Sequence, residues 1–184
     1  METLTEKVLA QLEETSDKFW NVSKDSANFL NMLIRIHKSQ EVLELGTSNG
    51  YSGIWLARAL EETGGHLTTI EYWDKRRDLA LENFKLCGVE DRITSRLGSA
   101  SDVIKEKLSD KQFDFVFMDA SKPHYLEFFE LLHPLLKSGG IIAADNITSH
   151  AEKVKPFVDE ISSRKDYQVQ ILPLPDGMLI ARKI

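Results

Sequence analysis

Residues 41–53 read EVLELGTSNGYSG and decide which fold this chain can adopt. The apolar run at 42–45 has the character of a short buried strand, and it leads through two glycines into an apolar helical pattern. A strand, a glycine loop and a helix in this order are typical of folds that hold a nucleotide at the helix N-terminus. The spacing Gly46-x3-Gly50-x2-Gly53 departs from the G-x-G-x-x-G of dinucleotide folds. It therefore disfavours a nicotinamide-dependent oxidoreductase.

Apolar runs and helical patterns alternate through the rest of the chain, which predicts a parallel sheet covered on both faces, a doubly wound α/β fold. Strands are expected at 66–70, 92–97, 113–118 and 141–144, and helices at 54–60, 79–86, 99–108 and 125–136. Two closing strand patterns, at 168–172 and 178–181, predict that one strand runs antiparallel to the others. Because Pro156 suits the start of a helix, residues 147–155 are expected to form an exposed loop.

Two further helices are expected before the first strand. The first carries Leu4, Val8 and Leu9 on one face, and the second follows an apolar stripe at 29–37. We expect residues 1–184 to form a single domain in which the N-terminal helices, within residues 1–38, pack on the core or on a partner subunit.

Composition narrows the class of protein. The 184 residues are 42% hydrophobic and 28% charged, with a formal net charge of -6. These values are typical of a globular domain, and the negative charge disfavours nucleic acid as the main partner. No apolar run has the length of a signal peptide or a membrane span. The expectation is therefore a cytoplasmic protein without a membrane partner.

Acidic side chains follow several of the predicted strands. Glu71 ends the second strand, where it could accept hydrogen bonds from both hydroxyls of a ribose. Asp119 ends a later strand, and Asp145 and Asn146 end the strand after it. Their oxygens suit Mg²⁺, and also Mn²⁺ or Ca²⁺. Lys122 lies within one turn of Asp119, where a neighbouring cation would make it a plausible base.

Five segments together resemble the cation-dependent O-methyltransferases of the catechol and caffeoyl-coenzyme A type. These segments are VLELGTSNGYS, TTIE, FVFMDASKPHY, LLKSGGIIAADN and LPDGMLIARK, in the family's order from about Ser23 onward. The resemblance implies a class I S-adenosylmethionine (SAM) methyltransferase fold. This is a Rossmann-like, mostly parallel sheet of seven strands, with the last strand inserted antiparallel between two others.

The resemblance also implies roles for individual residues. The methionine half of SAM would be surrounded by Glu44, Gly46, Ser48, Gly50, Tyr51 and Ser52. Glu71 would bind the ribose, and Ala100 in the loop 98–101 would border the adenine. Asp119, Asp145 and Asn146 match the metal ligands, Lys122 matches the proposed base, and Asp119 would also lie beside the cofactor and act in catalysis.

The expected activity is transfer of a methyl group from SAM to a hydroxyl of a small catechol-like or vicinal-diol acceptor, leaving S-adenosylhomocysteine (SAH). A homodimer is expected. Ser121 stands where the family often has Asp, and the family's glycine after the Asp-Asn pair is absent from residues 147–150. One alternative is an O-methyltransferase of a hydroxylated base in tRNA, helped by a basic patch of Arg35 with Lys75, Arg76 and Arg77. Another is a non-catalytic module for cofactor binding or dimerisation.

Overall fold

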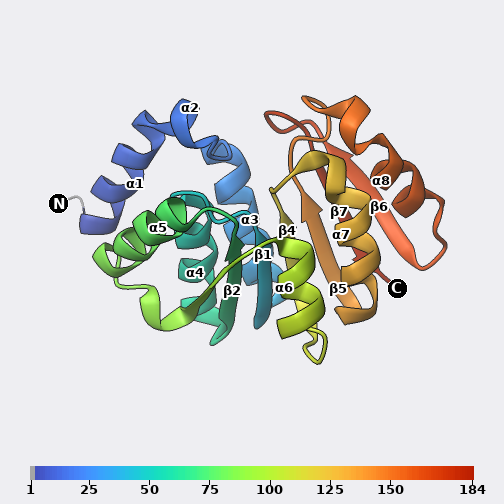
Figure 1. Ribbon diagram of the computed structural model, residues 1–184, viewed down its shortest axis with the longest axis horizontal. Coiled ribbons are helices and arrows are strands. Elements are labelled where there is room, and N and C mark those ends of the chain that lie inside the picture. The colour runs from blue at the N-terminus through green and yellow to red at the C-terminus, as the bar shows by residue number, and fades with distance from the viewer. Residues whose placement is uncertain (1–2) are drawn as a thin grey trace.

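A single seven-stranded sheet organises the chain in the computed structural model, which describes residues 3–184 (Figure 1). The first two residues of the expected domain lie outside this range. The strand order is β3-β2-β1-β4-β5-β7-β6. The strands are β1 (Glu41–Leu45), β2 (His66–Glu71), β3 (Ile93–Leu97), β4 (Phe113–Met118), β5 (Leu136–Ala144), β6 (Tyr167–Leu172) and β7 (Met178–Lys183). All pairs are parallel except those of β7, which runs antiparallel between β5 and β6. The predicted fold class and the inserted antiparallel strand are confirmed.

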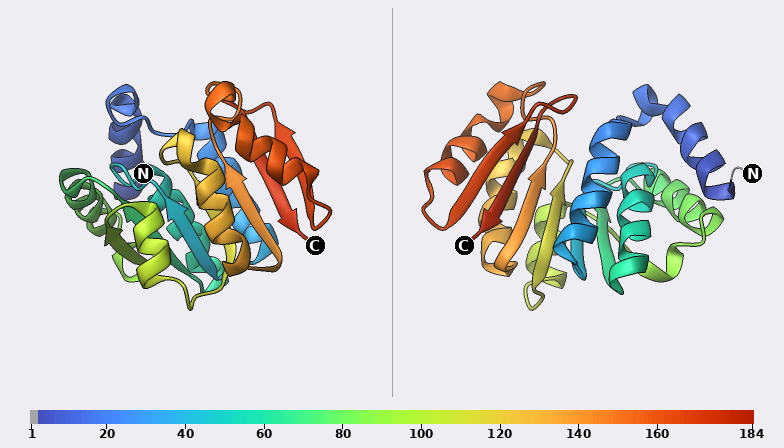
Figure 2. Two further views of the ribbon diagram at one scale, coloured as in Figure 1. Left: turned by 45° about the vertical axis from the view of Figure 1, so that its right-hand side comes forward. Right: turned by 180° about the vertical axis from the view of Figure 1, so that it is seen from behind.

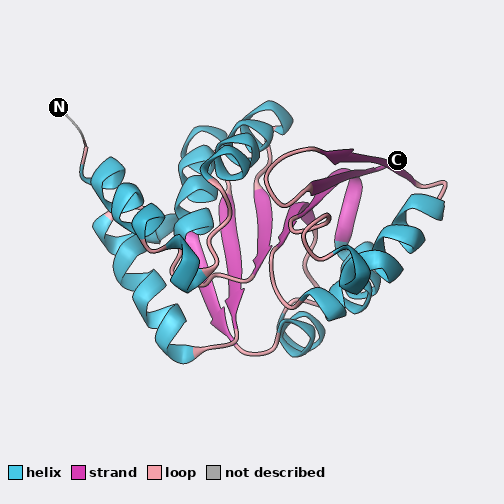
Figure 3. Cartoon of the chain, turned by 90° about the horizontal axis from the view of Figure 1, so that it is seen from above, coloured by secondary structure: helices cyan, strands magenta, loops and turns pink. Residues whose placement is uncertain are grey.

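Helices cover both faces of the sheet, as Figures 2 and 3 show. One face carries α3, α4 and α5, with α1 packed against α5, and the other carries α6, α7 and α8. The helices are α1 (Leu4–Glu14), α2 (Ser16–Phe19), α3 (Lys24–His37), α4 (Tyr51–Thr63), α5 (Asp74–Leu86), α6 (Ala100–Lys107), α7 (Tyr125–Leu132) and α8 (Ala151–Ser163). Three short 3₁₀ helices are η1 (Glu90–Arg92), η2 (Lys122–His124) and η3 (His133–Leu135).

Two apolar clusters lie between the sheet and its helices. Alternate residues of β1 separate them, because successive side chains of a strand point to opposite faces. Leu43 and Leu45 belong to the cluster under α6, α7 and α8. Val42 belongs to the cluster under α3 and α4, which Val8 and Leu9 of α1 extend. A strand buried on both faces needs a mostly apolar run, and within the buried part of β1 only Glu44 departs from it.

The prediction of a loop over 147–155 is wrong for residues 151–155, since α8 begins at Ala151 and contains Pro156. Val154, Phe157 and Ile161 are all buried at helical spacing, so burial of this stripe favours the helix. The proline ring lacks an N–H and removes one hydrogen bond within the second turn. The apolar burial outweighs that loss.

The boundary between α7 and β5 also differs from the expectation of a helix over 125–136. The helix ends at Leu132, η3 contains Pro134, and Leu136 is already the first residue of β5. Gly139 and Gly140 lie inside β5. The pairing of β5 with β4 shifts register nearby, between Phe113 and Phe115. Gly139 has φ +80° there, a conformation that glycine adopts without strain.

Within residues 3–184, no helix combines the length and the apolar character needed to cross a membrane.

Candidate active site

A cavity of about 1040 Å³ opens at the carboxyl ends of the parallel strands. It lies where the strand order reverses, because β1 has β2 on one side and β4 on the other. Ligands of doubly wound sheets bind at this switch point. Its volume is at the upper end of the range for small-molecule sites, about 300–1000 Å³. The cavity is therefore large enough for a nucleoside-sized ligand.

The loop after β1 forms one wall of the cavity. The N–H groups of Gly46 and Thr47 both donate to the Ile70 carbonyl of β2, at 3.0 and 3.2 Å. Gly46 has φ +99°, and a Cβ there would overlap the carbonyl oxygen of Asp119. Only glycine combines this backbone conformation with so close an approach to β4. Gly46 thus brings the wall from β1 against the residue that follows β4.

Glu71, the last residue of β2, completes the same wall. One carboxylate oxygen accepts from the N–H of Ser48 at 2.7 Å, and the other accepts from the N–H of Trp73 at 2.9 Å. The side chain is 6% exposed and lines the cavity. Each carboxylate oxygen can accept a second hydrogen bond, so Glu71 can bind a pair of ligand hydroxyls while it holds the loop.

Glu44 lies beneath this wall and does not line the cavity. Its two oxygens accept from the hydroxyls of Ser52 and Thr69, each at 2.6 Å. Complete burial raises the pKa of Glu44 to about 7, despite these two hydrogen bonds. Gly50 is also behind the wall, where a side chain would meet Phe84.

Tyr51 reaches from the cavity to the N-terminal helices. It lines the cavity, is 1% exposed, and donates its hydroxyl hydrogen to Glu13 of α1 at 2.9 Å. The same carboxylate accepts from Lys24 of α3 at 3.2 Å. Tyr51 therefore ties α4 to the segment of α1 and α3 beside the cavity.

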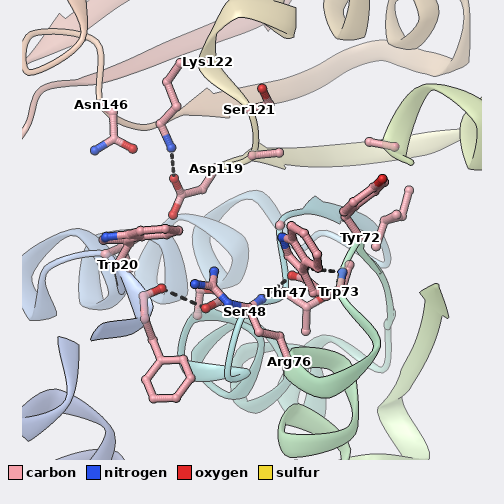
Figure 4. Close-up of a pocket in the computed structure, with 18 of the residues that line it drawn as sticks. Trp20, Thr47, Ser48, Tyr72, Trp73, Arg76, Asp119, Ser121, Lys122 and Asn146 are labelled. Carbon is pink, nitrogen blue, oxygen red and sulfur yellow. Dashed lines mark hydrogen bonds and ion pairs between the residues drawn. The ribbon is translucent and has the colours of Figure 1, made fainter. Parts of the chain in front are cut away.

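The opposite wall begins with Asp119 and Lys122, which face each other in Figure 4. Lys122 Nζ donates to Asp119 Oδ1 at 2.7 Å, and both side chains are largely buried, at 17% and 14% exposure. Burial raises the pKa of Asp119, while the ammonium of Lys122 opposes the shift. The predicted base and the predicted metal ligand are thus in direct contact.

Asp145 and Asn146 follow β5, which pairs with β4 up to Met118 and Ala144. Among residues 3–184, Asp145 Oδ1 has no hydrogen-bond partner although it is buried. Burial and the charge of Asp119 raise the pKa of Asp145 to about 8. Asn146 has φ +62° and its side chain lines the cavity. An unpartnered buried carboxylate oxygen beside a second carboxylate and an amide is a donor set that fits a hard divalent cation.

The residues that the sequence singled out converge on this cavity, with three exceptions. Gly46, Ser48, Tyr51, Ser52, Glu71, Ala100, Asp119, Lys122 and Asn146 line it. Glu44, Gly50 and Asp145 lie directly behind the lining. In residues 3–184 no group of three or more His, Cys, Asp and Glu side chains has a metal-binding arrangement. The predicted trio contains only two such side chains.

Sequence reasoning missed several lining residues. Tyr72 and Trp73 directly follow Glu71, so their position in the sequence could have indicated them. Trp20, Arg76 and Asp176 also line the cavity. Trp20 belongs to no quoted motif, Arg76 was named only for a basic patch, and Asp176 lies in the LPDGMLIARK segment without an assigned role. The charge of Asp176 adds to the raised pKa of both Asp119 and Asp145.

Comparisons with known proteins agree with this architecture. The model of a family described as O-methyltransferase matches residues 2–184. A catechol O-methyltransferase from Niastella koreensis is 37% identical over 129 residues, which are 69% of this chain and 58% of that protein. A caffeoyl-CoA O-methyltransferase from Medicago sativa is 30% identical over 97% of this chain and 82% of its own length. The structure of an O-methyltransferase from Bacillus cereus in complex with SAH superimposes with a TM-score of 0.89, at 27% identity, over 100% of this chain and 92% of that one.

Proposed function

This chain belongs to the O-methyltransferase family, and we propose that it transfers the methyl group of SAM, assisted by a divalent cation, to one hydroxyl of a small catechol-like acceptor. One observation carries the proposal. A single cavity joins a donor wall, made of the glycine loop and Glu71, to an acceptor wall, made of Asp119, Lys122 and Asn146. The first wall offers hydrogen bonds to a nucleoside, and the second offers hard oxygen ligands and an amine.

The wall made by the β1–α4 loop would bind SAM. Glu71 would accept hydrogen bonds from the ribose hydroxyls with its free lone pairs, and the Ser52 hydroxyl would lie near the methionine carboxylate. Glu71 already holds the Ser48 N–H, so little of the loop has to be reorganised on binding. Preorganisation of this kind lowers the entropy cost of binding.

The opposite wall would hold the divalent cation through Asp119, Asp145 and Asn146. The unpartnered Oδ1 of Asp145 is the observation that supports a cation there. A bound divalent ion would lower the pKa of an acceptor hydroxyl. Two adjacent oxygens on the acceptor would suit the positions that three protein ligands leave open.

Lys122 would take the hydroxyl proton in its neutral amine form, which a divalent cation bound nearby would favour. Lys122 Nζ lies 2.7 Å from Asp119, which would orient it toward an acceptor bound beside that carboxylate. SAM supplies a methyl group on a positively charged sulfur, so that the O–C bond forms as the C–S bond breaks and SAH remains. The chain itself contributes alignment of the acceptor oxygen with that methyl group, and such positioning is a large part of rate enhancement.

The test is methyl transfer from labelled SAM to catechols, hydroxycinnamoyl esters and bulk tRNA, each with Mg²⁺ and with chelator. We expect transfer to a diol that requires Mg²⁺. Transfer that is equally fast in chelator would contradict the cation's role.

The expected homodimer and cytoplasmic location remain part of the proposal. Sedimentation of the purified chain tests whether it is a dimer.

The tRNA alternative gains no support from the expected basic patch. Arg35 is paired with Glu62, Arg77 with Asp78, and Arg76 packs on Trp20. Methylation of tRNA in the same screen, without transfer to any diol, would replace the proposal. Binding of SAM without transfer to any acceptor would favour the non-catalytic alternative.

A further inference from the structure

Trp20 is an exposed aromatic residue that lines the cavity. It lies between α2 and α3, is 73% exposed, and has the left-handed conformation φ 57°, ψ 42°. In Figure 4 its indole lies between Asp119 on one side and Ser48 with Arg76 on the other. A bulky residue in this conformation is uncommon, and such strained positions cluster at active sites and ligand contacts.

The backbone around Trp20 is tied down on both sides. The Ser48 hydroxyl donates to the carbonyl of Phe19 at 2.8 Å, which attaches the segment to the glycine loop. The Asn21 side chain donates to the carbonyl of Leu12 at 3.0 Å, and Val22 is buried in the core. The indole therefore projects from a fixed base on the donor wall.

The indole face already carries a positive charge. The guanidinium carbon of Arg76 lies 4.6 Å from the ring centroid, within the range of a cation–π interaction. The hydrogen bonds and ion pairs among residues 3–184 give Arg76 no carboxylate partner. Its neighbour Arg77, in contrast, is paired with Asp78. The electron-rich face of Trp20 is thus the group that Arg76 contacts in the absence of a ligand.

We propose that the indole of Trp20 binds the sulfonium of SAM through a cation–π interaction, and that Arg76 occupies the same face when SAM is absent. This inference rests on the proposed function, because it assumes SAM as the donor. The sulfonium must lie between the donor loop at Ser48 and the methyl-accepting side at Asp119, which is where Figure 4 places the indole. Aromatic faces recognise such cations in other ligands.

This contact would let the site bind SAM more tightly than SAH. SAM carries a positive sulfur, while the sulfur of SAH is neutral, and the two molecules are otherwise alike apart from the methyl group. A cation–π contact stabilises bound SAM and gives little to bound SAH. Trp20 would therefore favour loading of the donor and release of the product.

The experiment compares the dissociation constants of SAM and SAH by calorimetry for the wild-type chain, Trp20→Leu and Trp20→Phe. Because a cation–π contact contributes about 0.5–2 kcal/mol, Trp20→Leu should weaken SAM binding about 2-fold to 30-fold. The change for SAH should be clearly smaller. Trp20→Phe keeps an aromatic face and should fall between the wild type and Trp20→Leu. An unchanged melting temperature shows that the variants are folded.

Trp73→Leu is the matched control. Trp73 is 60% exposed and lines the same cavity, but its ring packs edge-on against Tyr72 at 5.1 Å and holds no cation among residues 3–184. Any loss in this variant should be equal for SAM and SAH. Equal losses in Trp20→Leu, or no loss, would overturn the inference and leave the proposed function standing. A wild-type chain that binds neither molecule would instead refute the proposed function.

Discussion

Two buried carboxyl groups, Glu44 and Asp145, show how differently the two walls of the cavity are built. Both are almost inaccessible to solvent, and both have a pKa raised by burial, to about 7 and about 8. Each oxygen of Glu44 accepts a hydroxyl hydrogen bond, whereas one oxygen of Asp145 has no partner within residues 3–184. Glu44 is thus satisfied without a ligand, whereas the acceptor wall keeps an unpartnered carboxylate oxygen beside the Asp119–Lys122 ion pair.

This difference indicates how the stability of each wall depends on a bound ligand. A buried polar atom without a partner costs free energy, and two neighbouring carboxyls cannot both ionise cheaply. The acceptor wall should therefore respond strongly to a cation. The donor wall should respond mainly to changes in its own packing and hydrogen bonds. The predictions below test this contrast.

The largest effect is expected for Asp119→Ala. The variant loses a proposed metal ligand and the partner of Lys122, so methyl transfer with Mg²⁺ should fall about 1000-fold, or about 4 kcal/mol. Most of the affinity for SAM should remain, within about threefold, because the donor wall is intact. Steady-state rates and calorimetry measure the two quantities.

Asp159→Ala is the control for that variant, since Asp159 pairs with Lys155 on the exposed face of α8. It should leave both rate and affinity unchanged. An Asp119→Ala enzyme that is fully active in chelator would break the contrast between the walls.

The second prediction concerns the pH dependence of stability through Glu44. Its folded-state pKa of about 7 lies above the ordinary value of 4.5, so the native state holds the proton more tightly than the unfolded state. This group therefore makes the free energy of unfolding decrease as pH rises from 4.5 to about 7, by about 3 kcal/mol in total. Above that window the contribution stays constant.

Glu44→Gln removes this titration, and the difference between variant and wild type isolates it from the histidines. Urea unfolding at pH 5, 6, 7 and 8 measures the effect. Parallel pH curves for the two chains would show that Glu44 titrates normally in the fold.

A smaller effect is expected where the two walls touch, at Gly46. A side chain there would overlap the Asp119 carbonyl oxygen and impose strain at φ +99°, so Gly46→Ala should cost about 2–3 kcal/mol of stability. Gly64 has φ +77° with nothing near its Cβ position, so Gly64→Ala should cost only about 1 kcal/mol. Thermal or urea unfolding compares them. Equal losses would mean that the close contact between the walls contributes nothing.

The smallest effect is expected for Glu71→Ala. The variant removes the proposed ribose acceptor and the hydrogen bonds to Ser48 and Trp73, so SAM should bind more weakly by about 1–3 kcal/mol. Mg²⁺ binding should be unchanged because Glu71 belongs to the donor wall. Calorimetry measures both ligands, and an unchanged affinity for SAM would count against the ribose role.

Much of the fold was predictable because its signals are local. The apolar run before Gly46 and the strand ends at Glu71 and Asp119 are visible along the chain, and the switch-point rule gathers them at one edge of the sheet. The start of α8 was missed because Pro156 suggested a helix start, while the deciding factor was burial of Val154 and Phe157 against other elements. The helical spacing of Val154, Phe157 and Ile161 carries part of this signal along the chain, but Pro156 outweighed it in the prediction.

The sequence by itself determined the class of fold, the family resemblance and many of the polar residues around the cavity, because periodicity, glycine positions and strand-end acids are properties of consecutive residues. Only the tertiary structure decided that Glu44 lies behind the wall with its oxygens satisfied, that Asp145 has an unpartnered oxygen, and that Trp20 faces the cavity under Arg76. These features depend on contacts between residues far apart in the chain. Hydrogen-bond satisfaction and pKa are set by those contacts rather than by residue type.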